Sequence, residues 1–241
     1  MPPTYFKANE ASMAFQLLVD TYGIPTYHEA NPTPVSIVTF PFMFGMMFGD
    51  MGHGSILLSF GLFLTLMKSR LEGGAMKDVL PFRYLLLLMG MSSFYCGFCY
   101  NEFFAMPIHL FKSCYELDNK FEWKGAAGTP GNYVFTRPKD CTYPFGVDPV
   151  WGLASNKLTF TNNVKMKLSV IMGIVHMSIG VIMKGTNAIF FKRYADLTTE
   201  VITGLIILLG LFGWMDLLIF AKWFFPLDFS DRSRTVMDPL V

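Results

Sequence analysis

The candidate functional side chains of this chain of 241 residues lie within or beside its long apolar stretches: Asp50, His53, Glu102, His176 and Asp216. Two of them, Asp50 and His53, are the only ionisable groups between Val35 and Met67. Ionisable groups in such segments are costly in lipid, so they usually face protein or a water-filled cavity and often lie on an ion or substrate path. Their types indicate proton or cation transfer as the chemistry to consider first.

Asp50 and His53 are three residues apart, so in a helix they would share a face and could relay a proton or bind a cation. Two ligands do not make a zinc site, which normally has four, and we predict no metal. The structural alternative is that both residues lie at a turn between two helices and hydrogen-bond to backbone groups near the surrounding glycines.

The glycines of this segment predict close helix packing. Gly45 and Gly49 have the spacing of small residues at membrane helix interfaces, and Gly52 and Gly54 extend the set. A phosphate-binding loop is excluded because no Gly-Lys-Ser/Thr follows.

Glu102, next to Asn101, is the strongest single candidate for a buried carboxylate that takes up and releases protons. The alternative is that it lies near the end of its helix, already in water. His176 lies in mid-span and could titrate near neutral pH, or it could be a hydrogen-bonded packing residue. Asp216, in the last apolar stretch, is a further candidate to which the sequence assigns no definite role.

The four cysteines fall into two pairs. Cys96 and Cys99 form a C-x-x-C motif inside an apolar stretch with no second pair in reach, so we interpret them as packing residues. Cys114 and Cys141 lie in a long polar loop, where a disulfide is plausible on a non-cytosolic side. No cofactor site is predicted.

Composition sets the class of protein. The chain is 52% hydrophobic and 15% charged, and its apolar residues are grouped in blocks, which is typical of polytopic membrane proteins. The net charge of +1 gives no reason to expect nucleic acid as a partner. We therefore predict an all-α integral membrane protein: a polytopic helix bundle with about five transmembrane helices and one long polar non-cytosolic loop.

The stretch 35–67 is too long for one ordinary span, and the Gly49–Gly54 cluster is its natural break. Basic residues after Met67 and after Phe191 place those short loops in the cytosol. If 35–67 were a single tilted helix, the N-terminus would change sides. We expect a cytosolic or interfacial lead-in at 1–34, which contains a short amphipathic helix. Five spans follow, at 35–49, 55–67, 84–111, 166–191 and 201–225. A lumenal loop lies at 112–164, between the third and fourth spans, and a polar tail at 226–241.

Several segments together carry a family resemblance: Y-G-I-P-T-Y at 22–27, E-A-N-P at 29–32, the block 39–54, G-F-C-Y-N-E at 97–102, Y-P-F-G-V-D-P at 143–149 with Trp151, K-M-K-L-S at 165–169 and G-I-V-H-M at 173–177. In order and spacing they resemble the membrane sector of subunit a of the vacuolar-type proton-pumping ATPase (V-ATPase). The resemblance extends from about Phe15 to Trp223.

The resemblance implies a non-catalytic stator subunit of the V0 sector. In that family, subunit a faces a rotating ring of proteolipid subunits, supplies two offset aqueous half-channels, and is joined to the V1 peripheral stalk through a cytosolic arm. ATP hydrolysis takes place in other subunits. The expected partners are the proteolipid ring, other V0 subunits and membrane lipid. The expected location is the membrane of a vacuole, endosome or other acidic organelle.

The chain departs from the family pattern in its arginines. An arginine on a late helix keeps the two half-channels apart, whereas all six arginines here lie in loops, at a span edge or in the tail. We therefore expect the N-terminal part of the membrane sector, which should not pump protons by itself. Its helices would brace the ring-facing helices and help to line the lumenal exit.

Two other hypotheses come from different classes. A self-standing ion channel or secondary transporter would use Asp50, His53, Glu102 and His176, and predicts ion flux from this chain alone. A non-transporting assembly factor would bind the proteolipid ring or a chaperone. An intramembrane hydrolase has little support, because the sequence shows no nucleophile–base pair or metal triad.

Overall fold

A computed structural model describes residues 4–74, 76–117, 135–136, 141–153 and 157–224. The predicted tail 226–241 and much of the predicted loop 112–164 lie outside the described residues. Within them the chain is mostly helical, as predicted, and two short strand pairs are the departures from an all-α fold.

Helix α1, Met13–Tyr22, is the amphipathic helix expected in the lead-in. Its Phe15 is 1% exposed and packs with Ala14 and Leu85, whereas Tyr22, its last residue, is 95% exposed. The helix therefore anchors the lead-in to the bundle through its N-terminal half. The lead-in is also attached further on, where the Ala30 N–H donates to Asn187 Oδ1 at 3.0 Å.

Helices α2, Thr33–Met47, and α3, Met51–Leu66, replace the two spans expected from 35 to 67. The predicted break at 49–54 was wrong in its extent: it covers only residues 48–50, and α3 begins four residues before Ser55. The reason is the side chain of Asp50, which caps α3 by accepting from the N–H groups of Gly52 and His53. Gly52, His53 and Gly54 are therefore helical.

Helix α5, Arg83–Tyr100, follows a short helix α4, Lys68–Leu71, and a 3₁₀ turn, Leu80–Phe82. The helix expected over 84–111 ends at Tyr100, because Asn101 adopts a left-handed conformation (φ +54°) that terminates a helix. Strands β1, Glu102–Phe103, and β2, Met106–Pro107, then form an antiparallel hairpin. Glu102 is thus in a strand beyond the helix.

Glycines bring α3 and α5 into close contact. A Cβ atom added at any of four positions would lie under 3.0 Å from backbone atoms of the facing helix: Gly54 and Gly61 on α3, Gly90 and Gly97 on α5. The two glycines on each helix are seven residues apart, so they lie on one stripe of each helix. Small residues at such interfaces let backbones approach closely, and the α3–α5 pair is the most tightly packed part of the bundle.

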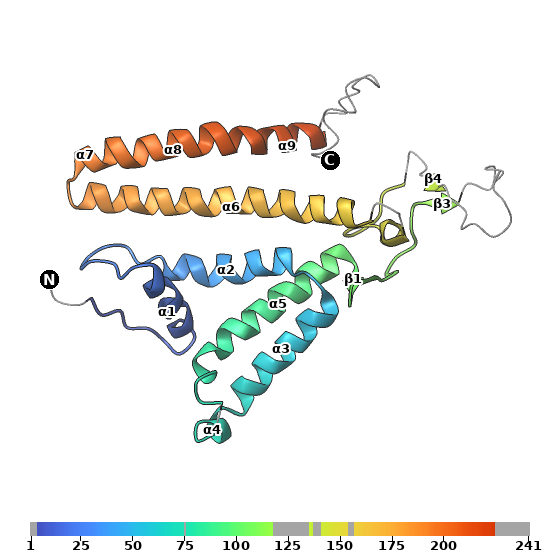
Figure 1. The fold of residues 1–241 in the computed structure, drawn as a ribbon, viewed down its shortest axis with the longest axis horizontal. Coiled ribbons are helices and arrows are strands. Elements are labelled where there is room, and N and C mark those ends of the chain that lie inside the picture. Colours follow the sequence, from blue (N-terminus) through green and yellow to red (C-terminus); the bar gives the residue numbers. More distant parts are fainter. Residues whose placement is uncertain (1–3, 75, 118–134, 137–140, 154–156, 225–241) are drawn as a thin grey trace.

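The second half of the chain is a long antiparallel hairpin (Figure 1). Helix α6 spans Lys157–Phe190, and the return is one continuous helical rod from Tyr194 to Phe224. That rod consists of α7, Tyr194–Asp196, a π-helical segment, Leu197–Ile202, α8, Thr203–Ile207, a second π-helical segment, Leu208–Gly213, and α9, Trp214–Phe224. Helix α2 lies alongside α6 and joins the hairpin to the rest of the bundle.

Both helical arms of this hairpin are longer than the spans predicted at 166–191 and 201–225. Helix α6 has 34 residues, or about 51 Å at 1.5 Å per residue, against a hydrocarbon core of about 30 Å. The helix is therefore longer than one crossing of that layer requires. Because the residues at the start of α6 are polar, a boundary placed by hydropathy began this span too late.

Three helical stretches within the described residues are long and apolar enough to cross a membrane: Leu80–Tyr100, Lys157–Phe190 and Tyr194–Phe224. Helices α2 and α3 are apolar but shorter, with 15 and 16 residues. The count of five spans and the assignment of sides stay predictions.

A charged cluster joins the lead-in to the loop between α3 and α5. Glu10 lies 2.7 Å from the Lys68 ammonium and 2.5 Å from the guanidinium of Arg83, whose side chain is 7% exposed. The Lys68 side chain, by its hydrogen bond and then its charge, lowers the pKa of Glu10 below the ordinary value of 4.5, and the charge of Arg83 acts in the same direction.

We expect Glu10→Gln to lower the melting temperature at pH 7, and the difference from wild type to vanish in acid. Since the folded-state pKa of Glu10 is depressed, its contribution is fully present above pH 4.5 and is lost as the pH falls through the lowered pKa. Thermal unfolding of both proteins between pH 7 and pH 3 measures this. Glu72→Gln is the control, because Glu72 lies 3.9 Å from Lys68 alone; an equal, pH-independent loss in both variants would contradict the prediction.

Candidate functional site

Polar contacts concentrate at the end of the bundle where α3 begins, α5 ends and α6 begins, which we call the loop end (residues 50–53, 101–117, 141–153 and 157–165). The basic loops after α3 and α6 lie at the opposite ends of those helices. The candidates Asp50, His53 and Glu102 lie at the loop end, whereas His176 and Asp216 do not.

Asp50 is the centre of a hydrogen-bonded cluster. Its Oδ1 atom accepts from the N–H groups of Gly52 at 2.7 Å, His53 at 3.2 Å and Phe104 at 3.0 Å, and its Oδ2 atom accepts from Ala105 N–H at 2.8 Å. The His53 Nδ1 atom is 3.3 Å from Oδ2. The geometry is the one expected from the structural alternative, a carboxylate at a helix–helix turn bonded to backbone, with His53 beside it.

The two hairpin amides that reach Asp50 belong to strained residues. Phe104 and Ala105 form the two-residue loop between β1 and β2, and both have positive φ, +49° and +60°. This is the pattern of a type I′ turn, which normally uses Asn-Gly or Gly-Gly. For residues with a Cβ atom each such conformation costs on the order of 1–2 kcal/mol, and the charged hydrogen bonds to Asp50 offset that cost.

Glu102 is ion-paired. Its Oε2 atom lies 2.9 Å from Lys165 Nζ on α6, and the two side chains are only 14% and 17% exposed. The Lys165 ammonium also lies 4.9 Å from the centre of the Tyr100 ring, and the Tyr100 hydroxyl donates to the Met46 carbonyl on α2 at 3.0 Å. This chain of contacts connects the hairpin, α5, α6 and α2.

The loop after β2 returns to the end of α5. Asn101, 1% exposed, donates from Nδ2 to the Val147 carbonyl at 2.7 Å, and the Val147 N–H donates to the Cys99 carbonyl at 3.0 Å. Gly146 has φ +77°, and a Cβ atom there would overlap the Cys99 carbonyl oxygen, so this approach requires glycine.

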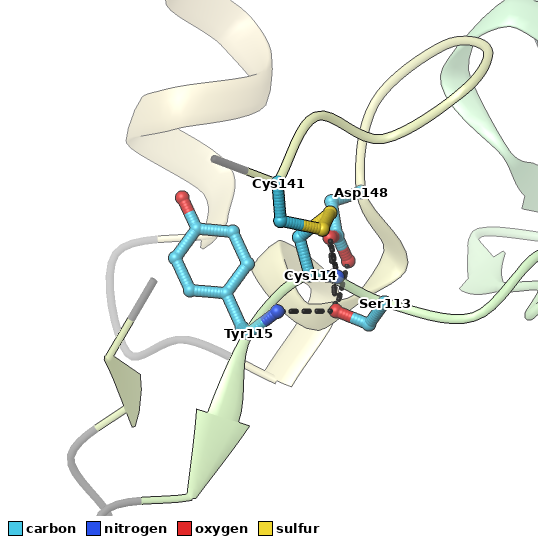
Figure 2. Close-up of a disulfide and its surroundings, with 5 residues drawn as sticks. All are labelled: Ser113, Cys114, Tyr115, Cys141 and Asp148. Atoms are coloured by element: carbon cyan, nitrogen blue, oxygen red, sulfur yellow. Dashed lines mark hydrogen bonds between the residues drawn. A yellow bond between two sulfur atoms is a disulfide. The ribbon is translucent and has the colours of Figure 1, made fainter. Parts of the chain in front are cut away.

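Cys114 and Cys141 form a disulfide, with Cα atoms 5.6 Å apart. Figure 2 shows Asp148 beside it, accepting from the Ser113 hydroxyl at 2.8 Å and the Cys114 N–H at 3.2 Å. Asp148 is 7% exposed, and its Oδ1 atom also accepts from the Val150 N–H. A disulfide forms in an oxidising compartment, so it agrees with the prediction that the loop end is non-cytosolic.

Replacing both Cys114 and Cys141 by serine should destabilise the loop end. The bridge spans 27 residues, for which the chain-entropy estimate is about 3–4 kcal/mol of stability in the oxidised protein. Thermal unfolding with and without reductant measures this, and Cys99→Ser is the control, since Cys99 is a free cysteine. Maleimide labelling of Cys114 or Cys141 in the native protein without reductant would contradict the pairing.

The glycines singled out from the sequence lie in close contacts between elements. A Cβ at Gly45 would meet the backbone of Ser92, one at Gly49 the side chains of Tyr100 and Cys96, and one at Gly52 the ring of Phe104. Gly54 faces the α5 backbone. Cys96 is buried among these contacts and Cys99 is half-buried. Within the described residues no group of three His, Cys, Asp or Glu side chains could hold a metal ion.

His176 and Asp216 lie in the other part of the molecule, on α6 and α9. Each has one buried polar atom without a hydrogen-bond partner, Nδ1 of His176 and Oδ1 of Asp216. The structure does not bring them together with Asp50 or Glu102. The set of four side chains on which a self-standing transporter would rely is therefore not assembled as one site.

Sequence reasoning missed Lys165, Lys157 and Asp148. Lys165 and Glu102 are separated by 62 residues, and no local pattern pairs them. A signal existed for Lys165: a lysine at the start of an apolar span needs either water or a carboxylate partner. Lys157 Nζ donates to the Ala105 carbonyl at 3.0 Å, a contact that no periodicity could indicate.

These elements, long apolar helices with a hydrogen-bonded polar network at one end, define an α-helical membrane protein. The family model of the V-type ATPase 116 kDa subunit family matches residues 1–240, and the chain belongs to that family.

Similar proteins occur in animals, amoebae and plants. The chain is 40% identical over 235 residues to mouse V-type proton ATPase 116 kDa subunit a 1, covering 92% of this chain and 28% of the relative. It is 41% identical over 232 residues to the vacuolar proton translocating ATPase 100 kDa subunit of Dictyostelium discoideum, covering 93% and 27%. For V-type proton ATPase subunit a1 of Arabidopsis thaliana the identity is 42% over 227 residues, covering 92% and 27%. The chain thus spans less than a third of the length of these relatives.

Proposed function

We propose that this chain acts as part of the membrane-embedded stator of a proton-translocating V-type ATPase, in the V0 sector. The observation that carries the proposal is the identity of 40–42% over more than nine-tenths of the chain to subunits whose names state a proton ATPase or proton translocation. The self-standing transporter is not favoured by this similarity.

Within the stator, the role that the geometry supports best is bracing. Asp50 already accepts four backbone N–H groups, and Glu102 is paired with Lys165. A proton taken up by either carboxyl would weaken contacts that join α3, the hairpin and α6. Both are therefore proposed to hold the helices in place near the lumenal exit rather than to carry protons.

The remaining assignments follow from this proposal. The chain's partners are the proteolipid ring and other V0 subunits, with the V1 peripheral stalk reached through the family's cytosolic arm. Its membrane is that of a vacuole, endosome or other acidic organelle. ATP is hydrolysed in other subunits, and this chain is a non-catalytic component that needs no cofactor of its own.

Affinity purification from detergent-solubilised membranes, with mass spectrometry of intact subunits, tests the proposal. We expect the proteolipid ring and the ATP-hydrolysing sector to co-purify with the chain. Recovery of the chain alone, or as a homo-oligomer, would count against it. As a second arm, the purified chain alone in vesicles should give no proton or cation flux, and flux dependent on Asp50 and Glu102 would favour the transporter instead.

A further inference from the structure

The hairpin Glu102–Pro107 follows α5 in the chain but lies over the start of α3. Contacts with α3 must therefore fix its position there. At its tip, the amides of Phe104 and Ala105 both point to the Asp50 carboxylate, at 3.0 and 2.8 Å. The Phe104 ring covers Gly52, where a Cβ atom would be 2.8 Å from the ring, and it meets the His53 ring edge-on at 5.1 Å.

Asp50 has two separable tasks. Capping α3 uses one oxygen, Oδ1, which accepts from Gly52 and His53, as the side-chain oxygen of an asparagine or serine would also do. Holding the tip uses both oxygens, because Ala105 N–H donates to Oδ2 alone. Only a carboxylate offers two acceptor atoms in this place. The aspartate is therefore needed for the hairpin more than for the helix.

The position of the hairpin determines that of Glu102, which opens it. Glu102 pairs with Pro107 across the hairpin, and Phe103 pairs with Met106. From this fixed ladder the Glu102 side chain reaches Lys165 on α6. A loosened tip would relax two adjacent residues with positive φ and, with them, the strand from which Glu102 projects.

We infer that Asp50 is a positioning residue: it fixes the strained tip Phe104-Ala105 and thereby aims Glu102 at Lys165. The inference rests on the proposed function only for its setting in the stator. His53 Nδ1 also lies 3.3 Å from Asp50 Oδ2, and its side chain is 68% exposed to solvent.

Two further charged contacts hold the hairpin within the described residues. Lys157 on α6 donates to the Ala105 carbonyl, and the pair Glu102–Lys165 lies at the base.

Hydrogen exchange of the full-length protein in lipid nanodiscs tests the inference with the variants Asp50→Asn and Asp50→Ala. Asp50→Asn keeps the cap but offers one acceptor oxygen, so we expect the amides of 103–106 to exchange about tenfold faster while those of the first turn of α3 keep their protection. Asp50→Ala should lose protection in both segments.

The contrast between the two variants separates positioning of the hairpin from support of the helix. Unchanged exchange at 103–106 in Asp50→Asn, or loss of protection in the first turn of α3 in that variant, would overturn the inference. The readout requires no proton pumping, so its failure is distinct from failure of the proposed function.

Discussion

Gly97→Ala should lower the free energy of unfolding by about 1–2 kcal/mol, and Gly97→Leu should prevent accumulation of the folded protein. The Cβ atom at Gly97 would overlap backbone atoms of Asp50 and Met51, and backbone cannot rotate aside as a side chain can. Overpacking of this kind usually costs about 1–3 kcal/mol. The higher helix propensity of alanine recovers up to about 1 kcal/mol of stability. The steric cost is larger, so the variant should be less stable than wild type.

The matched control is Gly173→Ala on α6. No atom lies within 4 Å of a Cβ at Gly173, so only helix propensity acts, and the variant should be unchanged or more stable by up to about 1 kcal/mol. Unfolding of both variants in detergent, measured against wild type, gives the comparison. Equal effects at Gly97 and Gly173 would mean that the close α3–α5 approach does not exist.

Lys165→Ala is expected to destabilise the loop end by about 3–5 kcal/mol, because it leaves the Glu102 carboxylate buried without its partner. Glu102→Gln should cost less, since the amide oxygen can still accept from Lys165. In the assembled complex, loss of the brace should reduce subunit recovery together with proton transport. Thermal unfolding and the yield of assembled complex, measured side by side, test this.

The exchanged pair Glu102→Lys with Lys165→Glu is the informative companion. If the two side chains act as a brace, the double variant should recover part of the stability lost in Lys165→Ala. If Glu102 instead carries protons, the double variant should remain inactive although it is stable and assembled, and Glu102→Gln should abolish transport without reducing assembly. That second pattern would refute the bracing role.

Much of the fold could be predicted from hydropathy and local residue types. The grouping of apolar residues predicted the helices, and family motifs such as the block 39–54 identified the relatives. Glycine spacing predicted close packing around Gly45 and Gly49. The ends of the helices were harder to predict. The termination at Tyr100 depends on the left-handed Asn101, and the start of α3 depends on the capping side chain of Asp50.

The sequence by itself determined that this is a helical membrane protein, because burial in lipid requires long apolar helices and these appear as long apolar blocks in the sequence. Its motifs indicated the V-type ATPase 116 kDa subunit family, which the family match confirms. It also identified Asp50 and Glu102 as carboxylates within or beside apolar stretches. Only the tertiary structure decided what they do, since Glu102 meets Lys165 and Asp50 meets Ala105 across 62 and 54 intervening residues. Contacts over such separations arise from how helices pack, and no local pattern records them.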